Sequence, residues 1–319
     1  MNPATVRTAL DAKTKPPGSL GFLEDLAVQI AVIQDTLEPR IDHPHLLTFA
    51  ANHGVTDEGV SAYPRAVTAQ MMANFQAGGA AINVLCRQAG ITHEVIDAGI
   101  EPGTRNFTRE PAMSASECNT ALQLGRDAVG RALERGADAI GIGEMGIGNT
   151  TSAAALLGGW LDLDPAVVTG AGTGVAGLAL ERKREAVRTA LRLHAGARNN
   201  PAHWLAAAGG FEIAAMTGAI LEASQRRVAL IVDGYIATSA AVMAFAMEPA
   251  SRDVCFFAHR SGEQGHATVL ERLGVRPILN LDLRLGEGTG AALAIPMVQA
   301  AAAILREMAT FASAGVSQQ

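Results

Sequence analysis

The chain has 319 residues, of which 49% are hydrophobic, 18% are charged and 4% are aromatic, and it contains 34 glycines. A chain of this length can bury a large core, and small aliphatic residues in place of aromatics are typical of a tightly packed α/β protein. The formal net charge of −6 argues against nucleic acid as a partner, because such proteins carry a basic surface. A local phosphate pocket is still compatible with this charge.

The cysteine content and the pattern of hydrophobic residues indicate the cellular compartment in which the protein works. The three cysteines, Cys86, Cys118 and Cys255, are odd in number and far apart, which predicts reduced thiols of a cytoplasmic protein. The start of the chain lacks the charged and then apolar pattern of a signal peptide. The apolar stretch 235–247 is shorter than a membrane span. We therefore expect a cytoplasmic protein without membrane contact.

Strand and helix patterns alternate along the chain. Short hydrophobic runs predict strands at 46–51, 93–97, 137–142, 166–170, 227–233, 254–259 and 277–283. Longer runs predict helices at 64–88, 116–135, 149–160, 177–196, 211–224, 236–247, 263–273 and 289–311. Helices between successive strands favour right-handed crossovers, so we expect a doubly wound, mostly parallel sheet.

The two ends of the chain have a different pattern. Residues 1–38 contain two short helical stretches around a KPPGSLG turn, and the last helix is followed only by a polar tail. We expect residues 1–38 and 289–319 to form a small, discontinuous helical domain. Residues 39–288 would then form the large catalytic domain.

Glycine-rich or polar segments follow most of the predicted strands. They are NHGV, DAGI, GIGEMG, TGAGTG, VDGY, AHRSGEQG and RLGEG. In a doubly wound fold the carboxyl ends of the parallel strands share one edge, where ligands bind. The sequence therefore predicts a ligand site on that edge.

The segment GEMGIGNTTSAAAL, residues 143–156, predicts an anion site. Its glycines allow close backbone approach, and a helix start offers unpaired N–H groups to a phosphate monoester. A carboxylate in the same loop is suited to ribose hydroxyls. The residues expected at phosphate and ribose are Glu144, Gly146, Gly148, Asn149, Thr150 and Thr151. The alternative is that Asn149 or Thr150 simply caps the helix.

The segment RLGEGTGAALA, residues 284–294, places Glu287 between two glycines. It follows the strand-like run 277–283 and precedes a helix of small residues. A glutamate at the carboxyl end of a strand, partly shielded from water, is a candidate general base. The alternative is an acidic residue that complements the helix dipole.

Signatures of other enzyme classes are weak or missing. No GxxxxGK[ST] motif occurs, and GAGTGVAG at 170–177 lacks the acidic residue expected about 20 positions on in a dinucleotide site. The histidines show no HExxH spacing and no cysteine partners, so we expect no metal. An NAD-binding oxidoreductase and a non-catalytic nucleotide-binding protein remain as alternatives.

Several motifs together resemble one known family. KPPGSLG, HGVTDEGVSAYPRAVTAQM, GEMGIGNTT, GGFEIAAMTGA, VDGYI and RLGEGTGAALA occur in this order, from about residue 13 to the end. This order resembles the nicotinate-nucleotide–dimethylbenzimidazole phosphoribosyltransferases of the cobalamin lower-ligand pathway. The resemblance implies a homodimer with a Rossmann-like large domain. It also implies transfer of 5-phosphoribose from nicotinate mononucleotide to 5,6-dimethylbenzimidazole, which yields α-ribazole 5′-phosphate and nicotinate.

The resemblance assigns Glu287 as the base that removes a proton from the attacking benzimidazole. The leaving pyridinium departs as a neutral ring, so no divalent metal is required to neutralise it, and no cofactor is expected. Lys183 is implied as the basic partner of the phosphate; the alternative is a solvated helix face shared with Arg182 and Arg184.

A slot for the acceptor base is expected in the segment SAYPRAVTAQM. Its residues Ser61, Tyr63, Gln70 and Met71 combine apolar surface with a few polar groups. The alternative is that the methionines belong to the core. Asn52 stands where the family often has aspartate, which removes a possible charge from the loop after the first strand.

Overall fold

A computed structural model describes residues 1–317. Its five strands are all parallel and lie in the order β2-β1-β3-β4-β5. They are β1 (Pro44–Ala51), β2 (Thr92–Gly99), β3 (Ala139–Met145), β4 (Ala229–Val232) and β5 (Cys255–Phe257). The predicted doubly wound, Rossmann-like fold is therefore confirmed. The strand order reverses between β1 and β3, and such a reversal opens a crevice at the carboxyl ends of the strands.

One face of the sheet is covered by α10 (Phe211–Arg226), and α5 (Ala115–Glu134) packs on the outer side of α10. These two helices are in very close contact. A Cβ atom on Gly125 of α5 would lie only 1.7 Å from the backbone oxygen of Ala215. Glycine is therefore required where the two helix backbones meet.

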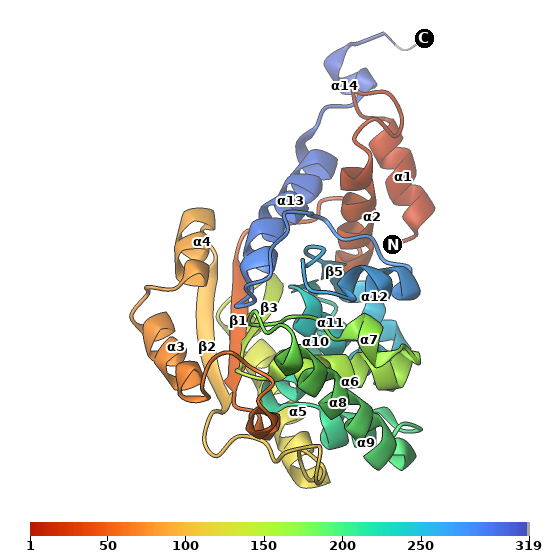
Figure 1. The fold of residues 1–319 in the computed structure, drawn as a ribbon. Coiled ribbons are helices and arrows are strands. Elements are labelled where there is room, and N and C mark those ends of the chain that lie inside the picture. Colours follow the sequence, from red (N-terminus) through yellow and green to blue (C-terminus); the bar gives the residue numbers. More distant parts are fainter. Residues whose placement is uncertain (318–319) are drawn as a thin grey trace.

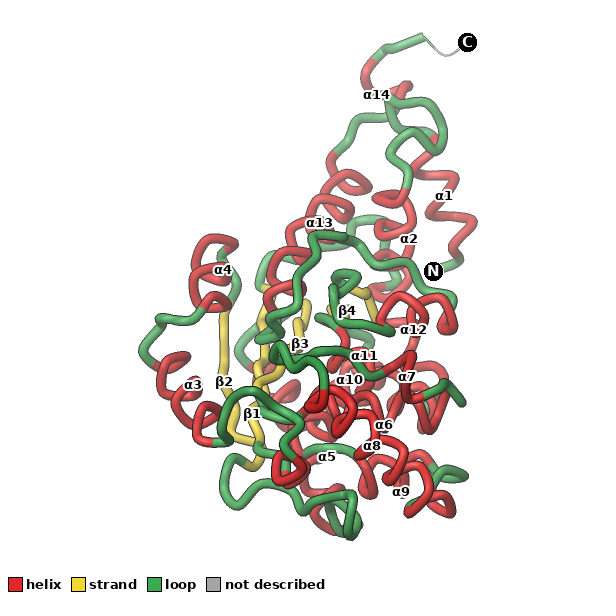
Figure 2. The backbone as a smooth tube through the Cα atoms, in the orientation of Figure 1, coloured by secondary structure: helices red, strands yellow, loops and turns green. Residues whose placement is uncertain are grey.

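The other face of the sheet is covered by α13 (Thr289–Glu307), α3 (Ala66–Gln76) and α4 (Ala81–Ala89). Figure 2 shows helices on both sides of the strands, so the sheet is buried in the middle layer. This burial explains the near-continuous hydrophobicity of β1, β4 and β5, whereas the edge strand β2 is only partly buried and carries polar residues. Further helices are α6 (Asn149–Leu161), α8 (Leu178–Leu193), α9 (Pro201–Ala208), α11 (Tyr235–Met247), α12 (His266–Leu273) and α14 (Phe311–Ala314).

Helices from both ends of the chain lie side by side (Figure 1). α1 (Pro3–Asp11) packs on α2 (Phe22–Gln34), which packs on α13. Lys13 also donates from Nζ to the backbone oxygen of Met308 at 2.7 Å. α13 contacts β3 and β4 as well, so it links the terminal helices to the sheet. The division into domains at 1–38, 39–288 and 289–319 stays a prediction.

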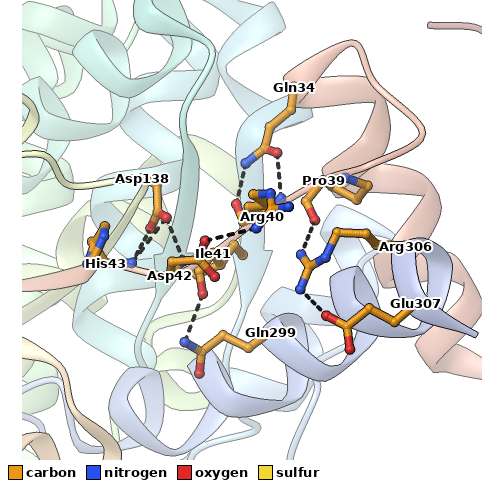
Figure 3. Close-up of polar contacts among 10 residues, drawn as sticks. All are labelled: Gln34, Pro39, Arg40, Ile41, Asp42, His43, Asp138, Gln299, Arg306 and Glu307. Atoms are coloured by element: carbon orange, nitrogen blue, oxygen red, sulfur yellow. Dashed lines mark hydrogen bonds and ion pairs between the residues drawn. The ribbon is translucent and has the colours of Figure 1, made fainter.

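The segment 39–43, which leads from α2 into β1, is tied on three sides (Figure 3). Gln34 at the end of α2 both donates to and accepts from its backbone. From α13, Gln299 and Arg306 donate to its backbone oxygens at 2.9 and 2.7 Å. The carboxylate of Asp138 accepts hydrogen bonds from two backbone N–H groups of this segment, those of Asp42 and His43. These bonds fix β1 relative to the terminal helices.

Among residues 1–317, α13 is the one helix that is long and apolar enough to cross a membrane by length and composition. Of its apolar window, 56% is buried inside the protein. The packing of α13 against α2, α4 and the sheet accounts for its apolar character.

The predicted strand at 166–170 is wrong, because residues Pro165–Val168 form the short helix α7. Asp164 accepts a hydrogen bond from the backbone N–H of Ala166, and proline occupies the first helical position. This combination starts a helix in spite of the β-branched residues that follow.

The predicted strand at 277–283 is also wrong. Only Leu279 forms an isolated bridge, to His259, and Asp282 has a left-handed backbone with a φ of +55°. Pro277 cannot donate a ladder hydrogen bond. This segment runs along the edge of the sheet beyond β5.

The predicted helix at 64–88 is two helices, α3 and α4. Gly78 has a φ of +77°, and a Cβ atom on Gly79 would lie 2.5 Å from the side chain of Asn74. The glycine pair therefore ends α3, and α4 begins at Ala81 in a new direction.

Candidate active site

A cavity of about 410 Å³ opens at the carboxyl ends of the strands. It is bordered by the segments after β3, β4 and β5, by the start of α6 and by residues 284–287. Of the predicted site residues, those that line it are Tyr63, Met71, Glu144, Gly146, Asn149, Thr150 and Glu287. Those that do not line it are Ser61, Gln70, Gly148, Thr151 and Lys183. The structure thus brings the two predicted glycine-rich segments to one cavity.

Glu287 is buried at the wall of this cavity. Its backbone is left-handed, with a φ of +65°, which costs a non-glycine residue about 1–2 kcal/mol. Its N–H donates to the backbone oxygen of Glu144 at 3.0 Å, and its Oε2 accepts from the N–H of Ile82 at 3.3 Å. Glu287 precedes the helix α13 rather than lying in its first turn. The helix-dipole alternative is therefore not supported.

Burial raises the pKa of the Glu287 carboxyl above its ordinary value. The hydrogen bond from Ile82 opposes this shift, and the nearby charge of Asp233 adds to it. A carboxylate with a raised pKa is a better proton acceptor than an exposed glutamate.

Two glycines allow the loop that carries Glu287 to lie directly on β3. A Cβ atom on Gly143 would lie 2.3 Å from the nitrogen of Gly288, and one on Gly286 would lie 2.3 Å from Oε1 of Glu144. A side chain at position 143 would push the backbone of Glu287 away from the sheet, and one at position 286 would collide with the carboxyl of Glu144.

Glu144 is buried at the end of β3, beside this loop. Its Oε2 accepts a hydrogen bond from the side-chain amide of Asn149. Burial raises its pKa well above the ordinary value, the negative charge of Glu212 adds to the shift, and the bond from Asn149 opposes it. The protonated form is thereby favoured, and a carboxyl in that form can both donate to and accept from a ribose hydroxyl.

The start of α6 leaves backbone N–H groups without a side-chain cap. Its N-cap is Gly148, with a φ of +99°, and Asn149 bonds to Glu144 instead. The alternative that Asn149 or Thr150 caps this helix is therefore wrong. Thr151 is fully buried, and its hydroxyl has no hydrogen-bond partner among the described residues. A helix start of this kind is suited to an anion.

Lys183 is 1% exposed, so the alternative of a solvated helix face is wrong for this residue. Its Nζ donates to Oγ1 of Thr150 at 2.8 Å and to the backbone oxygen of Gly170 at 2.9 Å. Burial lowers its pKa to about 8, and the charge of Glu263 partly opposes this shift. No described carboxylate forms an ion pair with it. Lys183 is thus a buried cation one hydroxyl away from the cavity.

The predicted base slot is only partly assembled at the cavity. Tyr63 and Met71 line it, whereas Gln70 is exposed on α3 and does not. Ser61 contacts Oγ1 of Thr173 at 3.2 Å, which ties this segment to the 170–174 loop. Met71 also packs against the hydrophobic core, which agrees with the alternative interpretation that the methionines of this segment are core residues.

Two acidic residues of the cavity were not singled out from the sequence. Asp233, after β4, accepts from the N–H groups of Gly288 and Ala291 at 3.2 and 3.0 Å. Burial raises its pKa to about 7, although these backbone bonds oppose the shift. Glu263 accepts from the N–H of Gly172 at 3.0 Å and so holds the 170–174 loop. Both lie in segments noted as polar strand ends, VDGY and AHRSGEQG, which was the available signal.

The loop after β1 lies beneath the cavity and supports it, and its residues Asn52 and His53 do not line the cavity surface. Asn52 donates to the backbone oxygen of Ile100 at 2.9 Å and does not line the cavity. His53 bonds to Glu212 at 2.6 Å and to Ser152 at 2.9 Å, all three fully buried. The substitution at Asn52 therefore changes the support of the loop rather than the charge of the cavity.

Two other chemistries find no support in the part of the chain described. GAGTGVAG follows the helix α7 instead of a strand, so it lacks the strand–turn–helix context of a dinucleotide site. Within residues 1–317, no group of three or more histidine, cysteine or acidic side chains is arranged to hold a metal ion.

Comparisons with known proteins agree with these features. A family model described as a phosphoribosyltransferase matches residues 3–316. The chain is 51% identical to the nicotinate-nucleotide–dimethylbenzimidazole phosphoribosyltransferase of Ralstonia nicotianae, over 99% of this chain and 94% of the relative. For the enzyme of the same name from Janthinobacterium sp. (strain Marseille), the identity is 48%, over 99% and 96%.

Solved structures show the same relationship. The crystal structure of CobT from Thermus thermophilus superimposes with a TM-score of 0.96 at 45% identity, over 99% of each chain. The matched region includes the terminal helices, the sheet and the cavity. The chain therefore belongs to the family of nicotinate-nucleotide–dimethylbenzimidazole phosphoribosyltransferases.

Proposed function

We propose that this enzyme transfers 5-phosphoribose from nicotinate mononucleotide to 5,6-dimethylbenzimidazole, with inversion at C1′. The products are α-ribazole 5′-phosphate, used in assembling the nucleotide loop of cobalamin, and nicotinate. The names of its relatives support the substrates, and the arrangement of Glu287 and α6 around one cavity supports the chemistry.

The donor phosphate binds at the start of α6 in this proposal. The backbone N–H and the hydroxyl of Thr150 supply donors there, since the N–H groups of Asn149 and Thr151 already donate to the backbone oxygens of Gly146 and Gly148. Lys183 supplies the charge through its contact with Thr150. A buried ammonium without a carboxylate partner gains free energy when an anion arrives, because its own burial is otherwise uncompensated.

Glu144 holds the ribose in this proposal. Its Oε2 is already bonded to Asn149, so Oε1 is the atom available to a ribose hydroxyl. Fixing the sugar places C1′ between the two bases, and such positioning accounts for much of the rate in a transfer of this kind.

The transfer itself needs one proton acceptor. One benzimidazole nitrogen attacks C1′, the bond from C1′ to the pyridinium nitrogen breaks, and its electron pair stays on nicotinate. The other benzimidazole nitrogen then loses its proton to the carboxylate of Glu287. Removal of this proton avoids a cation stranded in a closed cavity.

The acceptor base lies between Glu287 and the wall formed by Tyr63 and Met71 in this proposal. Ser61 acts by holding that wall through Thr173. Gln70, which is exposed in one chain, completes the slot only if its helix moves or a second subunit covers it.

The test is chromatography of nicotinate mononucleotide incubated with and without 5,6-dimethylbenzimidazole. We expect nicotinate and α-ribazole 5′-phosphate in equal amounts, and only when the base is present. Glu287→Gln should keep nucleotide binding and lose turnover by a factor on the order of 10² or more. Nicotinate release without the base, or near-normal turnover of Glu287→Gln, would contradict the proposal.

We further propose that the enzyme is a cytoplasmic homodimer, as the family resemblance implies. Light scattering during size-exclusion chromatography measures the mass directly. A single 33.0 kDa species at micromolar concentration would contradict the dimer.

A further inference from the structure

A chain of hydrogen bonds runs from the outer edge of the sheet to the backbone of Glu287. Asn83 of α4 contacts Nδ1 of His93 on β2 at 3.2 Å. Nε2 of His93 contacts Oγ1 of Thr48 on β1 at 2.9 Å. Oγ1 of Thr48 lies 2.8 Å from the backbone oxygen of Glu287.

The direction of every bond in this chain is fixed. A backbone oxygen only accepts, so the single hydroxyl hydrogen of Thr48 points to Glu287. Thr48 must then accept from Nε2–H of His93, and this leaves Nδ1 of His93 as an acceptor.

Asn83 supplies the matching donor. Its Oδ1 accepts from the N–H of Ala80 at 3.1 Å, and its Nδ2 donates to the backbone oxygen of Phe75 at 3.1 Å. A flipped amide would break both bonds, so Nδ2 faces His93. Burial lowers the pKa of His93 to about 4, which agrees with the neutral ring that this pattern requires.

We propose that Thr48 and His93 are positioning residues that hold the left-handed backbone of Glu287 and so aim its carboxylate into the cavity. The inference rests on the proposed function, because it presumes that Glu287 is the base. Neither residue lines the cavity, so each acts through the backbone of Glu287.

The site of this contact explains why a threonine is needed. Thr48 is fully buried and pairs in register with Gly143, the residue on which the Glu287 loop lies. Its hydroxyl is therefore directly below the carbonyl of Glu287. The N–H of Glu287 is held by the backbone oxygen of Glu144 and its carbonyl by Thr48, so both peptide groups that flank its Cα are fixed and the φ of +65° is kept. Loss of either contact lets this backbone relax and swing the side chain away.

The test measures kcat and the KM for nicotinate mononucleotide in variants of Thr48 and His93. Thr48→Val keeps the shape but removes the donor, and we expect kcat to fall about tenfold with an unchanged KM, since a misplaced base slows chemistry rather than binding. Thr48→Ser keeps the hydroxyl and should keep kcat within about twofold of the wild-type value. His93→Phe keeps the hydrogen bond from Thr48 to Glu287 but removes the contact of His93 that orients the Thr48 hydroxyl. We therefore expect kcat to fall about threefold.

Thr217→Val is the matched control. Thr217 is also fully buried and donates to backbone oxygens, of Ile213 and Ala240, but does not line the cavity. Its kcat should not change.

Three results would overturn the inference: a kcat of Thr48→Val within twofold of wild type, an equal loss in Thr48→Ser, or an equal loss in Thr217→Val. Normal turnover of Glu287→Gln would instead overturn the proposed function. The two failures are therefore distinguishable.

Discussion

The terminal helices and the cavity both bury acidic side chains, but in opposite ways. Between the terminal helices, Glu24 is 3% exposed and pairs with Lys15, with a distance of 2.7 Å from Nζ to Oε1. In the cavity, Glu144, Asp233 and Glu287 are equally buried and lie near one another, and none of them forms an ion pair with a lysine or arginine among the described residues.

The pKa values follow this difference. Burial alone would raise the pKa of Glu24, but the bonds from Lys15 and from the N–H of Leu20 outweigh it, so the pKa is lowered. In the cavity, burial raises all three pKa values, and the neighbouring negative charges raise those of Glu144 and Glu287 further.

The comparison separates a structural motif from a functional one. Lys15 comes from the KPPGSLG segment, and its contact with Glu24 fixes the turn between α1 and α2. A paired buried charge stabilises a fold only modestly, whereas buried like charges destabilise it and are kept where chemistry needs them. The following substitutions test this separation.

Gly143→Ala should have the largest effect on turnover. The new Cβ atom would lie 2.3 Å from the nitrogen of Gly288 and 2.5 Å from the carbonyl carbon of Glu287, so the base must move. We expect kcat to fall by a factor on the order of 10², as expected for a shift of about 1 Å at the reacting centre. Steady-state kinetics measures it.

Gly130→Ala is the control for this substitution. Gly130 lies within α5, and a Cβ atom there would meet nothing within 4 Å. Turnover should be unchanged, and stability should rise by up to about 1 kcal/mol from the better helix propensity. Similar kinetics in the two alanine variants would mean that the Glu287 loop does not depend on Gly143.

Lys15→Met should reduce stability and leave the chemistry unchanged. It strands the carboxylate of Glu24 in a buried site, which costs about 3 kcal/mol. Urea unfolding measures the loss, and kcat per folded enzyme should not change. Adding Glu24→Leu should restore most of the stability, because no unpaired charge then remains.

The control is the exposed pair of Arg7 and Asp25 in the same two helices. Arg7→Met should cost less than about 1 kcal/mol, as exposed ion pairs do. A kcat loss in folded Lys15→Met would show that the KPPGSLG segment affects catalysis, and the comparison of the two regions would then fail.

The sequence predicts most of the sheet, because the strands buried on both faces are continuous hydrophobic runs between helices. The run 277–283 has the same local pattern but forms only a single bridge, between Leu279 and His259, and its neighbours in space decide that outcome. The run 166–170 is predicted as a strand but begins as a helix, because Asp164 caps the helix and Pro165 occupies its first position. This local signal outweighs the strand propensity of the β-branched residues.

The candidate site divides in the same manner. Glu287 and the start of α6 could be predicted because glycines and polar residues mark them locally. Asp233 could not, since its role comes from contacts with Gly288 and Ala291, more than 50 positions away. The contact of Thr48 with Glu287 spans 239 positions and is likewise invisible in any local pattern.

Lys183→Met should weaken donor binding more than chemistry. The substitution keeps the length and apolar stem of the side chain but removes the buried charge beside Thr150. We expect the KM for nicotinate mononucleotide to rise about tenfold or more, as for the loss of a charged hydrogen bond. Arg182→Met, on the exposed side of α8, should leave the KM for nicotinate mononucleotide unchanged. An equal KM in the two variants would contradict the assignment of Lys183 to the phosphate site.

The remaining prediction concerns Asp233 and the pH dependence of stability. Its pKa is raised from 3.8 to about 7 by burial, so the folded protein holds this proton more tightly than the unfolded chain. The resulting stability is fully present below about pH 4 and is lost as the pH rises through 7, with a slope of at most about 1.4 kcal/mol per pH unit.

Asp233→Asn does not titrate, and its amide oxygen can still accept from Gly288 or Ala291. The free energy of unfolding, measured in urea at several pH values, should therefore fall less steeply between pH 4 and 7 than in the wild type. Glu24→Gln, in the paired region, should act with the opposite sign, because the lowered pKa of Glu24 gives a stability that is lost as the pH falls. Parallel pH profiles for both variants would show that the two regions bury their carboxylates at similar cost.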